Sequence, residues 1–380
     1  MPWDVQNAMS LRQEFVRLAA FEQANRRELC RRFGISPQTG YKWLARFVSD
    51  PQDRLEDRSR RPRSSPRSSE AEMEAMVTAL RAEHSAWGGR KISRRLYDIG
   101  GFVVAPNTVT SILHRHGLIM PQASYAAQPW QRFEHPDPNA LWQMDFKGYF
   151  PTPQGNCFPL TVLDDYSRFN LSLHACDRQA YQPVKAQLTE MFRRYGLPVR
   201  INTDNGPPWG CTRQPGQVTE LAIWLIRQGI RISFSRPYHP QTNGKAERFH
   251  RSLKAEVLNG RSFASLADAQ TAFDRWRQVY NHERPHQALA MATPDTRYRV
   301  SSQAFQDVVS PIQYGPDDTV VIVKSDGQVT FRGQHYKVSN PLKGLPVGIR
   351  PNASDDAIHD VYFMHHRLMT INLRDPVHSR

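Results

Sequence analysis

Apolar residues recur at helical spacing through the first fifty residues of the chain. Leu11, Phe15 and Leu18 would lie on one face of a helix. In the segment 34–37, which reads GISP, glycine can end one helix, serine can cap the next, and proline suits its first position. Such a tight turn is typical of a helix-turn-helix, although any small helical hairpin gives the same pattern. If the motif binds DNA, its second helix presents Gln38, Thr39, Lys42 and Arg46.

A second helical unit is predicted between residues 70 and 120. Met73, Val77 and Leu80 form an apolar stripe, the segment 87–89 interrupts it, and a further helix begins near Asn107. Another helix-turn-helix fits this pattern, and so does a purely structural three-helix cap. In the first case Asn107 and Thr108 are candidate DNA contacts.

The hydrophobic period changes from helical to alternating after a proline-punctuated connector at residues 121–136. Trp142 and Met144 face one way, whereas Gln143 and Asp145 face the other, as in a strand. Three antiparallel strands are expected first, followed by β-α-β units up to residue 234 and by helices at about 243–258 and 265–281. The pattern predicts a mixed α/β domain.

Short alternating segments with glycine turns follow residue 300 and predict a small β-barrel. The whole chain is therefore expected to be multidomain. The predicted boundaries are 1–50 and 70–120 for the two all-α helix-turn-helix units, 51–69 for a basic linker, 121–136 for the connector, 137–300 for the α/β core, and 301–380 for the β-rich domain.

The charge balance favours a polyanionic partner. The 380 residues include 50 Lys and Arg against 36 Asp and Glu, a formal net charge of +14. Each cation placed beside a phosphate releases a condensed counterion, although charge alone does not separate DNA from RNA or anionic lipid. The linker holds a run of arginines that either follows a DNA backbone or forms a solvated tether: Arg58, Arg60, Arg61 and Arg63.

Cysteine usage and apolar run length limit the class of protein further. The four cysteines show no Cys-x-x-Cys spacing, which argues against a disulfide framework or a zinc knuckle. No stretch approaches the roughly 20 apolar residues of a membrane-spanning helix, and the first residues lack a secretory signal. We expect a cytoplasmic, nucleoid-associated protein with no membrane partner.

Three carboxylates are candidates for metal-dependent chemistry. Asp145 and Asp204 occur at the middle or end of apolar strands, and Glu247 lies near the start of a helix. If these elements meet, the acids would repel one another unless they hold hard divalent cations. Solvated or capping carboxylates are the alternative when the three residues are considered without their neighbours. Asp164 and Asp165, at another strand end, either cap a turn or have a secondary role near this site.

The sequence around these acids resembles the retroviral-integrase superfamily of DDE recombinases, and more narrowly the bacterial insertion-sequence transposases. The resemblance is carried by residues 203–206 (TDNG), 239–254 (HPQTNGKAERFHRSLK), 142–147 (WQMDFK) and 280–289 (YNHERPHQAL). It implies a ribonuclease-H-like integrase core in which Asp145, Asp204 and Glu247 are catalytic and hold two Mg²⁺ or Mn²⁺ ions. The interval between the second and third acids is longer than in much of the superfamily, and residues 207–218 are the expected insertion.

Cations surround Glu247 in the same segment. Residues four and seven positions apart share a helix face, so Arg251 and Lys254 are expected beside Glu247 as phosphate contacts. Lys245 and Arg248 lie nearby and are weaker candidates. Solvated helix positions are the alternative for all four.

The resemblance implies a transposase that binds the ends of a mobile DNA element and catalyses strand cleavage and transfer into target DNA. Its expected partners are double-stranded DNA, further copies of the same chain on that DNA, and an accessory transposition protein if one is needed. Two rival interpretations remain. One is a ribonuclease-H-like nuclease without strand transfer. The other is a non-catalytic DNA-binding regulator or targeting factor derived from a transposase.

Overall fold

The computed structural model describes residues 8–52, 55–57, 69–119, 134–210, 217–235, 244–309, 311–352 and 354–375. These residues divide into two compact units, one up to Glu70 and one from Ala71 onward. The arginine run predicted in the linker lies outside the described residues, as does most of the predicted connector. No helix in the described part of the chain is both long and apolar enough to cross a lipid bilayer.

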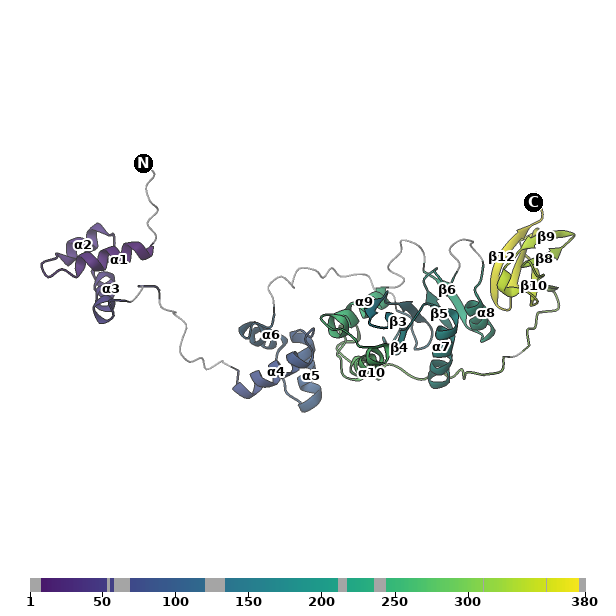
Figure 1. The fold of residues 1–380 in the computed structure, drawn as a ribbon, viewed down its shortest axis with the longest axis horizontal. Coiled ribbons are helices and arrows are strands. Elements are labelled where there is room, and N and C mark those ends of the chain that lie inside the picture. The colour runs from purple at the N-terminus through teal and green to yellow at the C-terminus, as the bar shows by residue number, and fades with distance from the viewer. Residues whose placement is uncertain are drawn as a thin grey trace. The chain divides into compact units, whose positions relative to one another are not determined.

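The first unit is a cluster of three helices, drawn in purple in Figure 1. They are α1 (Ala8–Ala19), α2 (Arg26–Arg32) and α3 (Pro37–Ser49). The Ser36 side chain accepts a hydrogen bond from the Thr39 amide, which confirms the predicted cap of α3. Gly40 lies where α3 crosses its neighbours: a β-carbon at this position would stand 2.5 Å from the Cys30 sulfur. The close helix crossing therefore requires glycine.

A second three-helix cluster opens the larger unit. It consists of α4 (Ala71–Glu83), α5 (Gly89–Gly100) and α6 (Pro106–Arg115). Val77, Trp87, Ile92 and Val109 are fully buried between these helices. Both predicted helical units are thus present, each with its own apolar core.

A mixed β-sheet follows. Its strands are β1 (Trp142–Phe146), β2 (Phe150–Thr152), β3 (Gly155–Asp164), β4 (Asn170–Cys176), β5 (Arg200–Thr203) and β6 (Arg231–Phe234). The order is β2-β3-β1-β5-β6, with β4 paired to β3. Strand β1 is antiparallel to β3 and parallel to β5, so it joins the hairpin half of the sheet to the β-α-β half. This arrangement confirms the predicted strand sequence.

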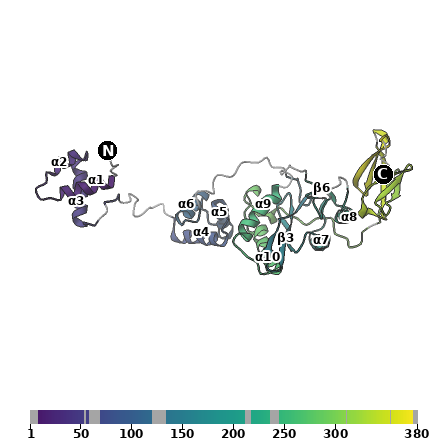
Figure 2. The same cartoon turned by 45° about the horizontal axis from the view of Figure 1, so that its top comes forward.

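Helices cover both faces of this sheet. On one face, α7 (Tyr181–Tyr195) and α8 (Glu220–Arg227) pack against Trp142 and Met144. On the other, α9 (Gly244–Leu253), a π-helical turn (Lys254–Leu258) and α10 (Leu266–His282) pack against Leu163 and Leu173. Figure 1 and Figure 2 both show α9 and α10 beside β3. The alternation of β1 therefore turns Gln143 and Asp145 toward the face that carries α9.

The last part of the chain is antiparallel β-structure. A four-stranded sheet has the order β12-β11-β10-β7, and β8 pairs with β9. The bounds are β7 (Thr319–Ile322), β8 (Gln328–Phe331), β9 (Gln334–Lys337), β10 (Pro346–Asn352), β11 (Asp355–Phe363) and β12 (His366–Asn372). Short 3₁₀ turns occur at Gln287–Leu289, Pro294–Thr296 and Asn340–Leu342. Among the described strands these are two separate sheets, and closure into a barrel stays a prediction.

Candidate active site

Strand pairing brings Asp145 and Asp204 into register. Trp142 pairs with Ile201 and Gln143 with Asn202 in the parallel ladder between β1 and β5. Continuing that register by two residues sets Asp145 opposite Asp204, which follows directly after β5. Neighbouring strands lie about 4.8 Å apart, so the two carboxylates occupy adjacent places at one edge of the sheet.

Helix α9 runs along β1 and carries Glu247. The Ala246 amide donates to the Gln143 side-chain oxygen at 3.2 Å, and His250 Nδ1 lies 4.0 Å from an Asp145 carboxylate oxygen. The helix rises about 6 Å from Ala246 to His250, and the strand rises about 6.6 Å from Gln143 to Asp145. The two contacts are therefore compatible with a helix that runs along the strand. Glu247 is exposed in the first turn of α9.

The electrostatics of Asp145 show that the other two acids are near. Burial, followed by the charges of Asp204 and Glu247, raises the pKa of Asp145 to about 7. The Phe146 amide donates to its carboxylate at 2.8 Å and only partly offsets this rise. Desolvation also raises the pKa of Asp204, against a hydrogen bond from the Gly206 amide. The metal-free protein thus disfavours full ionisation of these acids.

The three acids do not form a preformed metal-binding site in this arrangement. Among the described residues, no group of three or more His, Cys, Asp or Glu side chains has metal-ligand spacing. Oxygen donors with raised pKa values nevertheless suit a hard divalent cation, because bound positive charge would remove the repulsion. Glu247 is exposed, and its charge already acts on Asp145.

His250 is a site residue that sequence reasoning missed. It is buried, its Nε2 lies 2.9 Å from the Thr161 hydroxyl, and that hydroxyl donates to the Asp145 carbonyl. Burial, with the nearby charge of Lys147, lowers the pKa of His250 to about 4, so its imidazole is neutral near pH 7. The available signal was its position three residues after Glu247 on the same helix.

Asp164 and Asp165 are buried and fully partnered. Asp164 accepts from the amide and hydroxyl of Ser167 and from the Asn139 amide. Asp165 accepts from the His135 amide and the Gln143 side chain, each at 2.9 Å, and forms an ion pair with Lys245 at 2.5 Å. Asp164 therefore caps a turn, which was one of the two roles that the sequence suggested for it. Asp165 instead connects three elements around the acids.

The cations on α9 and the turn after it have different environments. Lys245 is paired to Asp165, which argues against its predicted phosphate contact, whereas Arg248, Arg251 and Lys254 are exposed. The predicted helix over 243–258 is confirmed as helical from Gly244 to Leu258, but α9 ends at Leu253 and the last turn, Lys254–Leu258, is π-helical. The prediction that Glu247 and Lys254 share a helix face assumed α-helical geometry throughout, which the structure has only up to Leu253. Along this segment, a stripe of apolar side chains is buried: Phe249, Leu253 and Val257.

The predicted DNA-contacting residues of the helical units are accessible to different degrees. Gln38 and Lys42 are exposed on α3, and Asn107 and Thr108 are exposed at the start of α6. Two others also have local partners, because the Thr39 hydroxyl contacts that of Ser36 and Arg46 donates to the Glu56 carbonyl.

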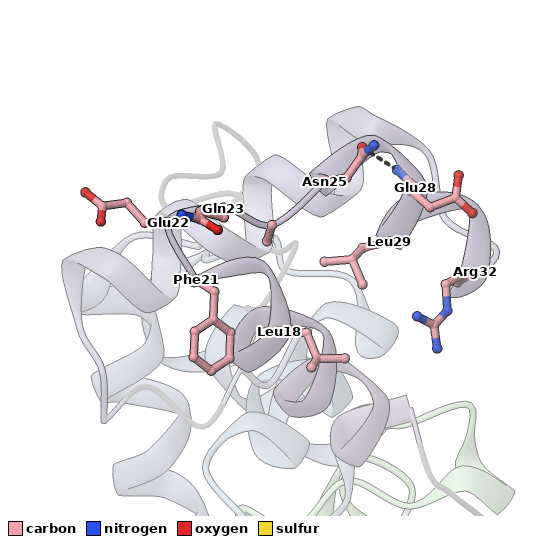
Figure 3. Close-up of a pocket in the computed structure, with 9 residues that line it drawn as sticks. Leu18, Phe21, Glu22, Gln23, Asn25, Glu28, Leu29 and Arg32 are labelled. Atoms are coloured by element: carbon pink, nitrogen blue, oxygen red, sulfur yellow. Dashed lines mark hydrogen bonds between the residues drawn. The ribbon is translucent and has the colours of Figure 1, made fainter.

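A surface hollow in the first unit lies where α1 turns into α2. Figure 3 shows Leu18, Phe21 and Leu29 along it, with Glu22 and Arg32 at its margin. Among the residues that the structure describes, none of the predicted DNA contacts lines this hollow.

Comparison with known families agrees with this architecture. Residues 135–240 and 228–294 match the Integrase core domain family. Residues 11–63 match a Helix-turn-helix domain, 39–113 a Homeodomain-like domain, and 318–377 the IS481 family transposase C-terminal domain. The order of these matches follows the predicted order of DNA-binding units, core and β-rich domain.

Curated relatives come from bacterial insertion elements. An uncharacterized protein of insertion element IS407 from Burkholderia multivorans is 28% identical over 45% of this chain and 62% of its own length. One from IS476 of Xanthomonas euvesicatoria is 30% identical over 41% of this chain and 43% of its own. The transposase of IS904 from Lactococcus lactis is 24% identical over 57% of this chain and 90% of its own.

The chain covers less than two thirds of the first two relatives. The chain combines an integrase core domain with helix-turn-helix domains and an insertion-sequence C-terminal domain. In this combination it is similar to the bacterial insertion-sequence transposases of the integrase superfamily.

Proposed function

We propose that this chain is a transposase that binds the ends of a mobile DNA element and catalyses metal-dependent strand cleavage and strand transfer. The observation that carries the proposal is that Asp145 on β1 and Asp204, directly after the neighbouring parallel strand β5, lie close enough for the charge of Asp204 to act on Asp145, with the charge of Glu247 acting on the same carboxylate. Acids that repel one another at a sheet edge have no stabilising role in the metal-free protein, so their grouping calls for a bound cation.

Asp145, Asp204 and Glu247 would hold the metal through carboxylate oxygens. Two Mg²⁺ or Mn²⁺ ions bound there supply activation of an attacking hydroxyl and stabilisation of the leaving oxygen in a phosphoryl displacement. The protein contributes by holding the three carboxylates in place. Asp145 would be held by β1 and Asp204 by the end of the neighbouring strand β5, and Glu247 would add its oxygens from α9.

DNA is held by separate parts of the chain. Arg248, Arg251 and Lys254 are exposed around Glu247 and suit the phosphates of the reacting strand. The two helical units would recognise the terminal sequences, which fits a net charge of +14. Water would first attack a phosphodiester at the element end, forming a P–O bond and releasing the element's 3′-hydroxyl. That hydroxyl would then attack a target phosphodiester and displace the target strand's own 3′-oxygen. Two ends must be joined, so we propose a homo-oligomer on DNA in the bacterial cytoplasm.

The test is cleavage of an oligonucleotide duplex that carries the element's own end. With Mg²⁺, the wild-type chain should nick at the terminus, and Asp204→Asn should bind the same duplex without cutting it. Cleavage that survives in this variant would refute the assignment of the acids.

A strand-transfer assay into plasmid DNA separates the proposal from its rivals. Joined products are expected from the transposase. Cleavage without joining would indicate a ribonuclease-H-like nuclease, and binding without any cleavage would indicate a non-catalytic regulator.

A further inference from the structure

One buried polar network links the two elements that carry the first and third acids. The Gln143 side chain donates to Asp165 at 2.9 Å and accepts from the Ala246 amide at 3.2 Å. Lys245 completes the network, because its ammonium lies 2.5 Å from the Asp165 carboxylate and donates to the Asp165 carbonyl at 3.1 Å. Strand β1, the turn after β3 and the first turn of α9 are thereby tied together.

The network is adjacent to the acids in sequence and in space. Gln143 is two residues before Asp145 on the same face of β1, and Lys245 is two residues before Glu247. The first amides of a helix have no acceptor within the helix, so the Gln143 oxygen supplies one to α9 from the strand. A shift of α9 along β1 would break this bond and the ion pair together.

Burial distinguishes this role from DNA contact. The Asp165 side chain is only 2% exposed and that of Lys245 only 18% exposed. A phosphate-binding lysine would need to leave a buried carboxylate unpaired, which is costly. By contrast, Arg251 and Lys254 are exposed and can reach DNA without breaking a buried pair.

We propose that Gln143, Asp165 and Lys245 are positioning residues that fix α9 on β1 and so set the place of Glu247 relative to Asp145. This inference rests on the proposed function of the acids. Supporting groups around metal ligands typically change metal affinity or activity by about 10- to 100-fold when they are removed. The network should therefore act on metal binding and turnover rather than on DNA affinity.

The experiment compares Lys245→Met with Lys245→Arg in the full-length chain bound to an uncleaved end duplex. Mn²⁺ affinity is measured by electron paramagnetic resonance of the free ion, and kcat by cleavage at saturating DNA and Mg²⁺. Lys245→Met should weaken Mn²⁺ binding and lower kcat by about 10- to 100-fold, with end affinity unchanged within about twofold. Lys245→Arg retains the ion pair and should restore both.

Two further variants control for lost charge and lost stability. Lys185→Met removes a half-buried lysine of α7 and should leave metal affinity unchanged. The pair Asp165→Asn with Lys245→Met balances the buried charge and should recover the thermal midpoint while Mn²⁺ binding stays weak. Recovery of Mn²⁺ affinity in the double variant would overturn the inference.

Other outcomes separate this inference from the proposed function. If Lys245→Met weakens end binding, lowers the salt slope by about one and leaves Mn²⁺ affinity intact, Lys245 is a phosphate contact and the positioning role is wrong. Unchanged metal affinity and kcat would also overturn it, with the catalytic proposal intact. A wild-type chain that neither binds Mn²⁺ at these acids nor cleaves DNA would overturn both.

Discussion

Two sets of acidic side chains lie along β1, and they differ in their partners. Asp164 and Asp165, beside the start of the strand, each accept hydrogen bonds from the surrounding chain, and Asp165 also has Lys245. Asp145, near the end of the strand, has one backbone donor, and burial followed by the charges of two neighbouring acids raises its pKa to about 7. Burial raises the pKa of Asp164 as well, against hydrogen bonds from Ser167 and Asn139. The difference is that Asp164 and Asp165 have donors that would be left unpaired without them, whereas the mutually repelling acids are available to a cation.

This difference separates stability from activity in a single domain. Removing a partnered acid should cost folding free energy, because its donors remain buried. Removing a repelling acid should cost activity and leave the metal-free fold intact or more stable. Substitutions in each set therefore test whether the two kinds of acid differ in this way.

The largest effect is expected for Asp204→Asn. The amide retains the size of the side chain but loses the charge that would bind metal, so cleavage of an end duplex should fall by at least about 10³-fold. Gel-shift affinity for the same duplex and the thermal midpoint should stay near wild type. A variant that cleaves normally would place Asp204 with the structural acids.

Asp165→Ala should show the opposite pattern. The substitution removes the carboxylate that pairs with the Lys245 ammonium and accepts from the Gln143 amide, at a cost of about 3–5 kcal/mol in the free energy of unfolding. Urea unfolding measures the change. Asp177→Ala removes an exposed acid of the same domain and should change stability by less than about 0.5 kcal/mol. Equal effects of the two substitutions would contradict the account.

Asp145 should make the metal-free protein pH-sensitive. Its pKa is about 7 when folded against an ordinary value of 3.8, so the folded state retains a proton that the unfolded chain has lost. Its contribution to stability is complete below about pH 4 and is lost as the pH rises to about 7.

Thermal unfolding in chelator, compared at pH 5 and pH 8, tests this sign. As the pH rises from 5 to 8, the thermal midpoint of the wild type should fall by about 3–6 °C relative to that of Asp145→Asn. If the thermal midpoints of the wild type and the variant change equally with pH, Asp145 is not repelled by its neighbours.

The smallest effect extends the comparison to cations. Arg251 is exposed, in contrast to the paired Lys245, so Arg251→Ala should weaken binding to any DNA sequence by a few fold and reduce the salt slope by about one. Fluorescence anisotropy at several salt concentrations measures both quantities. An unchanged salt slope would remove Arg251 from the DNA surface.

The sequence predicted the architecture well because local patterns determine much of it. Alternation at Trp142 and Met144 identified the strand face, and the Ser36 cap identified the start of α3. The π-helical turn after Leu253 was not predictable, since it preserves the apolar spacing of Phe249, Leu253 and Val257. The family match supports the core as a domain without testing individual site residues.

Partners of polar residues were the part that the sequence did not supply. Lys245 resembled its neighbours Arg248 and Arg251, and only the tertiary fold placed it against Asp165. His250 and Gln143 had no composition signal, because their roles depend on which strand lies beneath α9. Local spacing gives a helix face, but the packing of that face decides which cations stay exposed.

The most direct test of the central claim is the location of bound metal. Crystals of the full-length chain with an element-end duplex and Mn²⁺ would give anomalous density at the ions. The account predicts density bound by carboxylate oxygens of Asp145, Asp204 and Glu247 together. Density that contacts Asp164 or Asp165 instead, or that leaves Glu247 unbound while DNA is engaged, would contradict it.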